Sequence, residues 1–362
     1  MTLEEARAAF PVLERYAYLN AGSVGPLSRA TSDAMAAAER DELEHGRGTW
    51  RYITSMLEAR AKLRASLASL IEVEADLLSL TTSTSEGCRI VLAGLGLTAE
   101  DEVVTTDAEH FGLTGALHAS GARVRVAKVR DRPADQALDA ILAQVGPRTK
   151  LVGVSHVLWL TGHIVPLEEL RDALSVPLLV DGAQSVGAIP VDASAFDFYT
   201  VSGQKWLCGP APTGGLYVRD PERLAVALPS YFSQAGYDPD GAFEPQPGAL
   251  RFDATWIPVG FLDGLQAAID GAPDWRYDRA RETTELCRRR LVEGGFDVVT
   301  EPGHGTLVSW RWPGEPKEVA EALARGDVII RDLPGTGLLR ASCGYWTSEE
   351  DIDRLVAGLS AL

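Results

Sequence analysis

The sequence has few cysteines, no long apolar run and no excess of basic residues, and each shortage excludes a class of protein. Only four of the 362 residues are cysteine, they are widely scattered, and no CxxC pair occurs. This usage argues against a disulfide framework or a zinc site, so we expect a reducing, cytoplasmic environment and no bound metal. No apolar stretch approaches the length of a membrane span, and the acidic start Met1-Thr-Leu-Glu-Glu is unlike a signal peptide.

Basic residues are outnumbered by acidic ones. Lys and Arg total 34 against 51 Asp and Glu, which gives a formal net charge of −17. Nucleic acids and anionic membranes attract basic surfaces, so we expect neither as a partner. The GxGxxG and Walker patterns are also absent, which argues against a nucleotide as the ligand of any phosphate site.

The length predicts about two domains, and the central part of the chain has a clear periodicity. Short β-rich apolar runs alternate there with helical patterns, which predicts an α/β fold whose sheet is covered by helices on both faces. Runs such as Leu151-Val-Gly-Val are apolar throughout, as buried, mainly parallel strands require. The seven predicted strands are Leu77–Leu80, Glu102–Thr105, Arg123–Val126, Lys150–Ser155, Pro177–Val180, Phe196–Thr200 and Gly214–Val218.

The flanking segments have different patterns. Long amphipathic helices are expected between Ala30 and Leu70, and a smaller α+β pattern follows Pro258. We therefore expect an N-terminal segment (residues 1–25), a large domain (26–257) and a small C-terminal domain (258–362).

Two charged residues follow predicted strands at the edge where ligands of such sheets bind. Asp181 comes directly after Leu178-Leu-Val, and Lys205 follows a later run by a few residues. Taken singly, they fit a helix cap and a surface lysine. The 24 residues between them are the length of one crossover, so both can face one cleft. There an acid can hold a protonated heterocyclic nitrogen, such as that of pyridoxal 5'-phosphate (PLP), and a desolvated amine can form a Schiff base.

Three further signals fit the same cleft, although each has an ordinary structural explanation. Thr84 and Ser85 lie at a strand-to-helix junction, where hydroxyls serve as N-caps or as a phosphate cup. His110 follows another strand and is either a satisfied loop residue or a ring that stacks and transfers protons. Arg340 lies mid-strand among apolar residues, where it needs an ion-pair partner or a substrate carboxylate.

These segments resemble the class V aminotransferase-like family of fold-type I PLP enzymes. That family includes cysteine desulfurases, selenocysteine lyases, isopenicillin N epimerase-like proteins and kynureninases. The resemblance extends over nearly the whole chain, from Tyr18-Leu-Asn-Ala-Gly to the segment that begins Arg340-Ala-Ser-Cys-Gly. It implies the aspartate aminotransferase-like fold.

The resemblance also implies a role for each site residue. Lys205 would carry the cofactor, and His110 would stack on its ring as a catalytic residue beside Asp181. Arg340 would bind the substrate carboxylate, with Asn20 and Trp159 also lining the substrate pocket. The segment Arg251-Phe-Asp-Ala-Thr255 resembles a loop whose Thr reaches the phosphate bound by the other subunit, which implies a homodimer with a shared active site. The remaining cofactor contacts would be Asp181 to the ring nitrogen, Gln184 to the ring 3′-oxygen, and Thr84, Ser85 and Ser202 to the phosphate.

The sequence departs from the family at two places. Trp159 stands where relatives usually carry Asn or a small polar residue, so it can narrow the pocket or stack on a substrate. The loop Asp327–Arg340 contains no cysteine, whereas desulfurases carry a reactive one before the corresponding Arg. Cys343 is close in sequence, but alternation along a strand would turn it away from Arg340.

We therefore expect a PLP enzyme that cleaves the Cβ–S bond of a cysteine-like amino acid without an enzyme persulfide. Transamination or epimerisation through the same carbanion is the alternative. A non-catalytic α/β binding domain is disfavoured because Lys205 and Asp181 are both present, and a nucleotide-binding Rossmann protein is disfavoured because its glycine fingerprint is missing.

Overall fold

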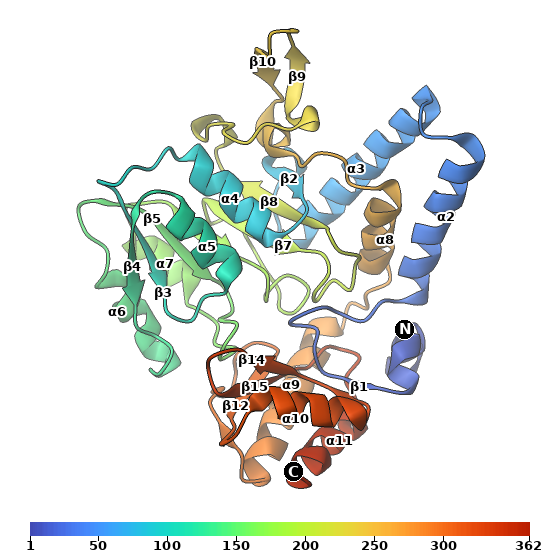
Figure 1. Cartoon of the computed structure of the whole chain (residues 1–362), viewed down its shortest axis with the longest axis vertical. Helices are drawn as coiled ribbons and strands as arrows, with labels where there is room; N and C mark the ends of the chain where they lie inside the picture. The colour runs from blue at the N-terminus through green and yellow to red at the C-terminus, as the bar shows by residue number, and fades with distance from the viewer.

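The computed structural model describes all residues, 1–362, and contains a seven-stranded sheet between helices and a smaller four-stranded sheet (Figure 1). The large sheet has the strand order β2-β8-β7-β6-β5-β3-β4, which confirms the expected α/β fold. Its strands are β2 (Leu78–Thr81), β3 (Glu102–Thr106), β4 (Arg123–Ala127), β5 (Thr149–Ser155), β6 (Leu178–Asp181), β7 (Phe198–Ser202) and β8 (Gly214–Val218).

The direction of the strands decides where a site can form. The strands β4, β3, β5, β6 and β7 are parallel to one another, and β8 is antiparallel to both β7 and β2. The carboxyl ends of β3, β5, β6 and β7 therefore meet at one edge, and the loops that leave this edge carry the candidate residues.

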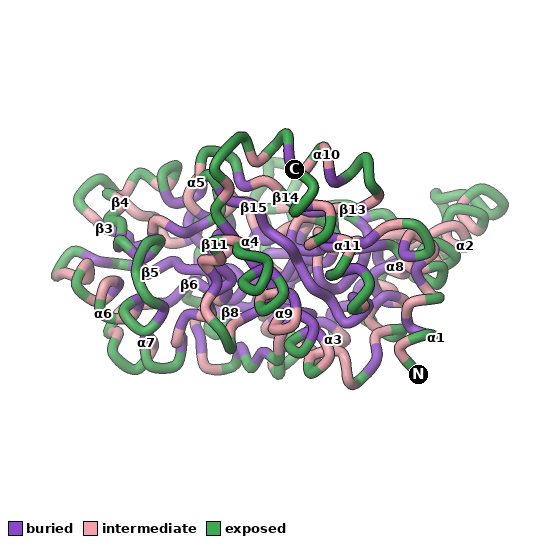
Figure 2. The backbone as a smooth tube through the Cα atoms, turned by 90° about the horizontal axis from the view of Figure 1, so that it is seen from below, coloured by how far each residue is buried: buried purple, intermediate pink, exposed green.

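Helices cover both faces of the large sheet, so each face has its own core. One face is covered by α3 (Trp50–Leu70), α6 (Ala137–Leu142), α7 (Leu167–Ala173) and α8 (Val259–Asp270). The other is covered by α4 (Thr84–Gly94) and α5 (Phe111–Ala119). Figure 2 shows the buried residues along the middle of the molecule and the exposed ones on the outer turns. No helix has the length and apolar character needed to cross a membrane.

The small sheet has the order β11-β12-β15-β14 and is entirely antiparallel. Its elements are β11 (Asp297–Val298), β12 (Leu307–Arg311), β14 (Arg331–Leu333) and β15 (Leu338–Ser342), with helices α9 (Arg276–Glu293), α10 (Pro316–Arg325) and α11 (Glu349–Ser360). These helices bury Cys287, Leu291, Leu323 and Leu355 in one core with Trp310 of β12.

Packing at both ends of the large domain bears on its boundaries. Leu262 and Leu265 of α8 belong to the core of the large sheet, although they lie beyond residue 257. At the other end, β1 (Ala17–Tyr18) pairs with β13 (Val328–Ile329) of the small domain. We therefore propose that the large domain extends through α8 and that the N-terminal segment folds onto the small domain.

A loop after β5 joins the two domains. Gly162 has a φ of +77°, and its carbonyl accepts from the Gly305 N–H at 3.0 Å. Nearby, the Thr300 hydroxyl donates to the Thr161 carbonyl at 2.6 Å, and the rings of His163 and His304 lie 4.8 Å apart. Two neutral imidazoles can pack in this way, but two charged ones would repel each other.

We expect this junction to weaken in acid because burial lowers the pKa of His163 to about 4, with His304 as a smaller cause. In the unfolded chain this imidazole is protonated below about pH 6.5, whereas in the folded protein it stays neutral down to about pH 4. Protonation therefore favours the unfolded state, and stability falls as the pH drops from about 6.5 toward 4. Between pH 7.5 and pH 5 the loss from this residue is about 2 kcal/mol. Urea unfolding measures the free energy of unfolding at both pH values. In His163→Gln the difference between the two values should be smaller by that amount, and an unchanged difference would show that His163 does not cause the acid sensitivity.

Candidate active site

Asp181 and Lys205 lie at the carboxyl ends of neighbouring parallel strands. Asp181 ends β6, is only 3% exposed, and accepts at Oδ1 from the Ala183 N–H at 2.9 Å. Lys205 follows the end of β7 by three residues and forms no ion pair. Burial lowers the pKa of Lys205 to about 8, while the Asp181 carboxylate acts in the opposite direction. The two residues thus lie at the ends of paired strands, and near neutral pH a usable fraction of the amine is uncharged and nucleophilic.

Arg340 is a buried cation with no acidic partner. It lies in the middle of β15, is 2% exposed, and makes one hydrogen bond, from Nη1 to the Trp159 carbonyl at 2.9 Å. Its Nε atom is buried without a partner. Burial lowers its pKa to about 9, and Arg331, directly opposite on β14, adds to the effect. A buried guanidinium group without an acidic partner can bind a carboxylate.

The geometry of His110 determines which ring nitrogen is free. His110 is the N-cap of α5, and its Nδ1 atom accepts from the Gly112 N–H at 3.1 Å. The neutral ring therefore carries its proton on Nε2. Burial lowers the pKa of His110, and Lys205 lowers it further, which keeps the ring neutral. The Trp159 ring stands edge-on to it, with centroids 5.1 Å apart, and the Trp159 indole nitrogen is buried without a partner.

The predicted phosphate residues surround the start of α4. Ser83 caps this helix by accepting from the Glu86 N–H, and Thr84 and Ser85 form its first turn. The helix dipole and the free N–H groups there favour an anion. At the end of β7, the Ser202 hydroxyl donates to the Gln204 side chain at 2.9 Å, so it has to rotate before it can donate to a phosphate.

Gln184 is held by the protein at both ends of its amide. Its Oε1 atom accepts from the Trp206 indole N–H at 2.9 Å, and its Nε2 atom donates to the Gly22 carbonyl at 2.8 Å. Because indole only donates and a carbonyl only accepts, these partners fix the orientation of the amide. One N–H of Gln184 is left over, and this is the group that would serve a ring oxygen.

The N-terminal loop forms one wall of the site, and only Asn20 of this wall was singled out from the sequence. The Asn20 Oδ1 atom is buried without a partner. A Cβ on Gly22 would lie 2.8 Å from the Arg340 guanidinium, and one on Gly25 would lie 2.1 Å from the Lys205 carbonyl. Both positions therefore require glycine. The two glycines of the run Asn-Ala-Gly-Ser-Val-Gly are the sequence feature that could have indicated this wall.

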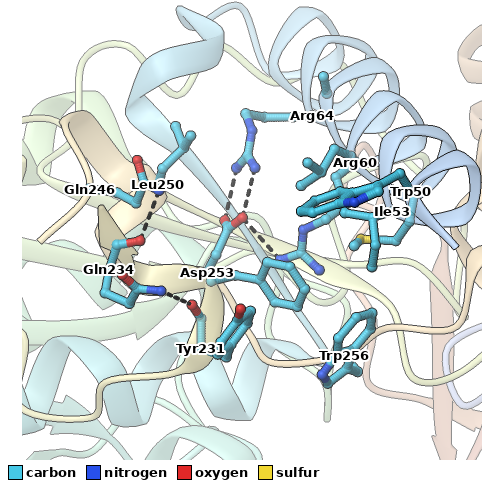
Figure 3. A pocket seen from close by; sticks show the side chains of 14 residues that line it. Trp50, Ile53, Arg60, Arg64, Tyr231, Gln234, Gln246, Leu250, Asp253 and Trp256 are labelled. Carbon is cyan, nitrogen blue, oxygen red and sulfur yellow. Dashed lines mark hydrogen bonds and ion pairs between the residues drawn. The ribbon is translucent and has the colours of Figure 1, made fainter. Parts of the chain in front are cut away.

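Thr255 does not join this cluster within one chain. It follows the short helix Gly248–Phe252 and is exposed. Beside it, Asp253 is buried and accepts from Arg60 at 3.0 Å and from Arg64 at 2.7 Å (Figure 3). These three residues form an ion cluster that holds the segment before Thr255 in place.

No thiol is exposed near the site. All four cysteines are free and buried, and burial raises the pKa of the Cys208 thiol. Cys343 lies in the core of the small domain beside Cys287, and hydrogen bonding and burial raise its pKa well above the usual value. Cys343 thus packs into the core of the small domain and not into the pocket, and none of the four cysteine side chains is exposed. No cluster of three or more His, Cys, Asp or Glu side chains is arranged to bind a metal ion.

These residues fit PLP, the cofactor that the sequence predicts. Lys205 offers an amine without an ion-pair partner at the same edge of the sheet as Asp181, and the start of α4 offers donors for a phosphate. Two buried polar atoms without a partner, Nε of Arg340 and Oδ1 of Asn20, can form hydrogen bonds with an amino-acid substrate. A cluster with this donor set can bind an aldehyde on the amine, hold its ring nitrogen, and orient a carboxylate.

The chain is similar to known proteins over nearly its whole length. A family model for aminotransferase class V matches residues 23–291. An isopenicillin N epimerase from Streptomyces clavuligerus is 30% identical, with 99% of this chain and 98% of the relative covered. A probable cysteine desulfurase from Methanothermobacter thermautotrophicus is also 30% identical, with 98% and 96% covered.

Two solved structures of the cystine C–S lyase C-DES have the same fold with a TM-score of 0.90. The complex with its reaction product cysteine persulfide is 29% identical and covers 97% of this chain and 99% of that one. A mutant with glycine covalently linked to its PLP cofactor is 28% identical and covers 98% of both chains.

Proposed function

This chain belongs to the class V aminotransferase family of PLP-dependent enzymes, and on this premise we propose that it cleaves the Cβ–S bond of a cysteine-like amino acid without an enzyme persulfide. The observation that carries the proposal is the absence of an accessible thiol: Asp327–Arg340 contains no cysteine, and all four cysteines are buried. The likeness to a cystine C–S lyase supports the same reaction class.

In this proposal, each residue has a defined task. Arg340 binds the α-carboxylate through the N–H groups that its bond to Trp159 leaves free. Bound PLP would supply a ring that stabilises negative charge at the substrate Cα, and Asp181 would keep its nitrogen protonated. The Lys205 amine, whose pKa lies near 8, takes up the Cα proton. An S-substituted cysteine and water then yield a thiol, pyruvate and ammonia.

The substrate pocket has donors for a second acceptor group. The Trp159 indole N–H is buried and unpartnered, and Arg331 stands directly opposite Arg340. These groups favour an amino acid whose sulfur substituent carries an oxygen or a second carboxylate, as cystine does.

The test is to incubate the PLP-loaded enzyme with cysteine, cystine and S-conjugates of cysteine, and to measure pyruvate and thiol. We expect pyruvate from cystine or an S-conjugate, with the thiol or persulfide released into solution. A Cys343→Ala variant should retain this activity, because its thiol is buried in the core of the small domain. The lyase proposal fails if no substrate gives pyruvate.

Epimerisation is the second candidate, and the likeness to isopenicillin N epimerase over 99% of the chain favours it. Both reactions begin when Lys205 removes the Cα proton, and they differ in where the proton returns. Incubation in D₂O separates them, because an epimerase exchanges the Cα hydrogen and interconverts the two stereoisomers without releasing pyruvate. An amino donor that converts the cofactor to its amine form would instead favour transamination.

We also propose that two copies of the chain share the active site. An apolar hollow of about 570 Å³ lies beside Thr255, between α3 and the segment that begins at Tyr231 (Figure 3). Trp50, Tyr231 and Trp256 line it and are largely exposed in a single chain. Aromatic surface of this kind favours a protein partner. A second copy placed there would bring its phosphate site toward Thr255. The four free cysteines fit the cytoplasm, where we expect this dimer to form.

Disrupting this surface should separate the subunits. We expect Trp50→Glu/Trp256→Glu to sediment as a monomer and to bind PLP more weakly than the unmodified dimer. The matched control is Val292→Glu on α9, because Val292 and Trp256 are both 49% exposed but Val292 lies outside the hollow. Sedimentation of the unmodified protein as a monomer would exclude the shared site.

A further inference from the structure

Glu109 is a buried acid to which the proposed reaction assigns no task. It lies between β3 and α5 and is 8% exposed. Its Oε1 atom accepts from the Thr106 hydroxyl at 2.7 Å, and its Oε2 atom accepts from the Ser155 N–H at 3.0 Å and from the Ser155 hydroxyl. No Lys, Arg or His is paired with it. Burying a carboxylate without a cation is costly, so this position calls for an explanation.

The contacts of Glu109 lead to the cofactor residues on both sides. Ser155 is the last residue of β5 and stands opposite Asp181 in the register with β6. On the other side, Glu109 directly precedes His110, the N-cap of α5. One carboxylate thus fixes the strand end beside Asp181 and the turn that presents His110.

The acid that acts on Glu109 is Asp181, and Lys205 is a cation that acts on Asp181 in turn. The titratable groups that face it are Asp181 on β6 and Cys88 on α4. The Cys88 thiol is neutral, because burial and the two acids raise its pKa well above the usual value. Burial raises the pKa of Glu109 to about 7, and the Asp181 carboxylate raises it further. Two buried acids therefore lie together, and a cation bound to one of them would relieve their repulsion.

We infer that Glu109 is a positioning residue that favours a proton on the ring nitrogen held by Asp181. The inference rests on the proposed function, in which Asp181 binds the cofactor nitrogen. Glu109 touches neither cofactor nor substrate and acts through Ser155 and through its charge. A second negative charge behind Asp181 raises the affinity of the ring nitrogen for its proton.

The experiment follows the ring nitrogen itself. Unmodified protein and Glu109→Gln are loaded with PLP carrying ¹⁵N in the ring, and the ¹⁵N chemical shift is recorded against pH. Gln has the size of Glu and can still accept from Ser155, but it carries no charge. We expect the pH at which the ring nitrogen loses its proton to fall by roughly one to two units in Glu109→Gln, because charges in a buried site interact more strongly than charges in water.

Two further variants distinguish the charge from the packing. Glu102→Gln removes another buried acid of β3, one that is paired with Arg148 at the far end of the strand, and should leave the ring titration unchanged. Ser155→Ala keeps the acid but removes one donor to it, and should give a smaller fall in the same direction. Folded, loaded Glu109→Gln that titrates like the unmodified protein overturns the inference. If Glu109→Gln does not fold, a Ser155→Ala variant whose ring nitrogen titrates like that of the unmodified protein overturns the inference.

The readout also separates this inference from the proposed lyase activity. A shifted ring titration without any pyruvate would leave the inference standing and reject the lyase. Pyruvate release together with an unshifted ring titration would support the lyase and reject the inference about Glu109. If borohydride fixes no PLP on Lys205, both proposals fail together.

Discussion

Replacing Lys205 with alanine is expected to abolish turnover and covalent cofactor attachment together. The variant loses both the amine that bonds the cofactor and the base that takes up the substrate proton, so kcat should fall by at least about 10³-fold. Burial holds the pKa of the Lys205 amine near 8, which suits this amine to both tasks near neutral pH. Borohydride reduction followed by mass spectrometry should find PLP on the unmodified chain and none on the variant.

The control for Lys205 is a lysine far from the site. Lys317 lies on the exposed face of α10, and its nearest acid, Glu321, is 4.0 Å away. Lys317→Ala should keep full cofactor attachment and unchanged kinetics. Reduction that labels Lys205→Ala as fully as the unmodified chain would show that another residue carries the cofactor.

The largest loss of stability is expected from Asp253→Asn. Asp253 accepts from Arg60, from both terminal nitrogens of Arg64 and from the Leu80 N–H of β2, and all of these groups are buried. Removing the acid leaves two buried guanidinium groups without a counter-ion, which typically costs about 3–5 kcal/mol. Urea unfolding followed by circular dichroism measures this loss.

Asp253→Asn also tests the proposed subunit contact, because Asp253 holds the segment that presents Thr255. We expect weaker dimerisation along with the lower stability. The exposed pair of Asp172 and Arg171 offers the control, since Asp172→Asn removes an acid from a surface ion pair and should change stability little. If Asp253→Asn unfolds with the same urea midpoint as the unmodified protein, the ion cluster does not stabilise the fold.

Most of the large sheet was predictable because its strands other than the edge strand β4 are buried on both faces. Runs such as Leu151-Val-Gly-Val need no partner to be recognised, and the carboxyl ends of the parallel strands place Asp181 and Lys205 together. Local pattern thus predicts the fold class and brings Asp181 and Lys205 to the same edge of the sheet.

Contacts between distant segments were not predictable. Arg60 meets Asp253 across 193 residues, and Gln184 meets Gly22 across 162. Glu109 escaped notice because an acid in a loop ordinarily faces water, and only the fold reveals that it is buried. Residues whose role depends on burial rather than on chemical type need the structure.

The glycine-lined wall of the pocket has a practical consequence for producing the protein. The first 25 residues look dispensable, yet they pair with β13, and Gly22 and Gly25 lie against Arg340 and Lys205. A shortened gene product beginning at Pro26 would lack this wall and leave the Arg340 guanidinium group and the Lys205 backbone uncovered on that side. A purification tag at the C-terminus leaves this wall and the hydrogen bond from the Trp275 indole to the Met1 carbonyl unchanged.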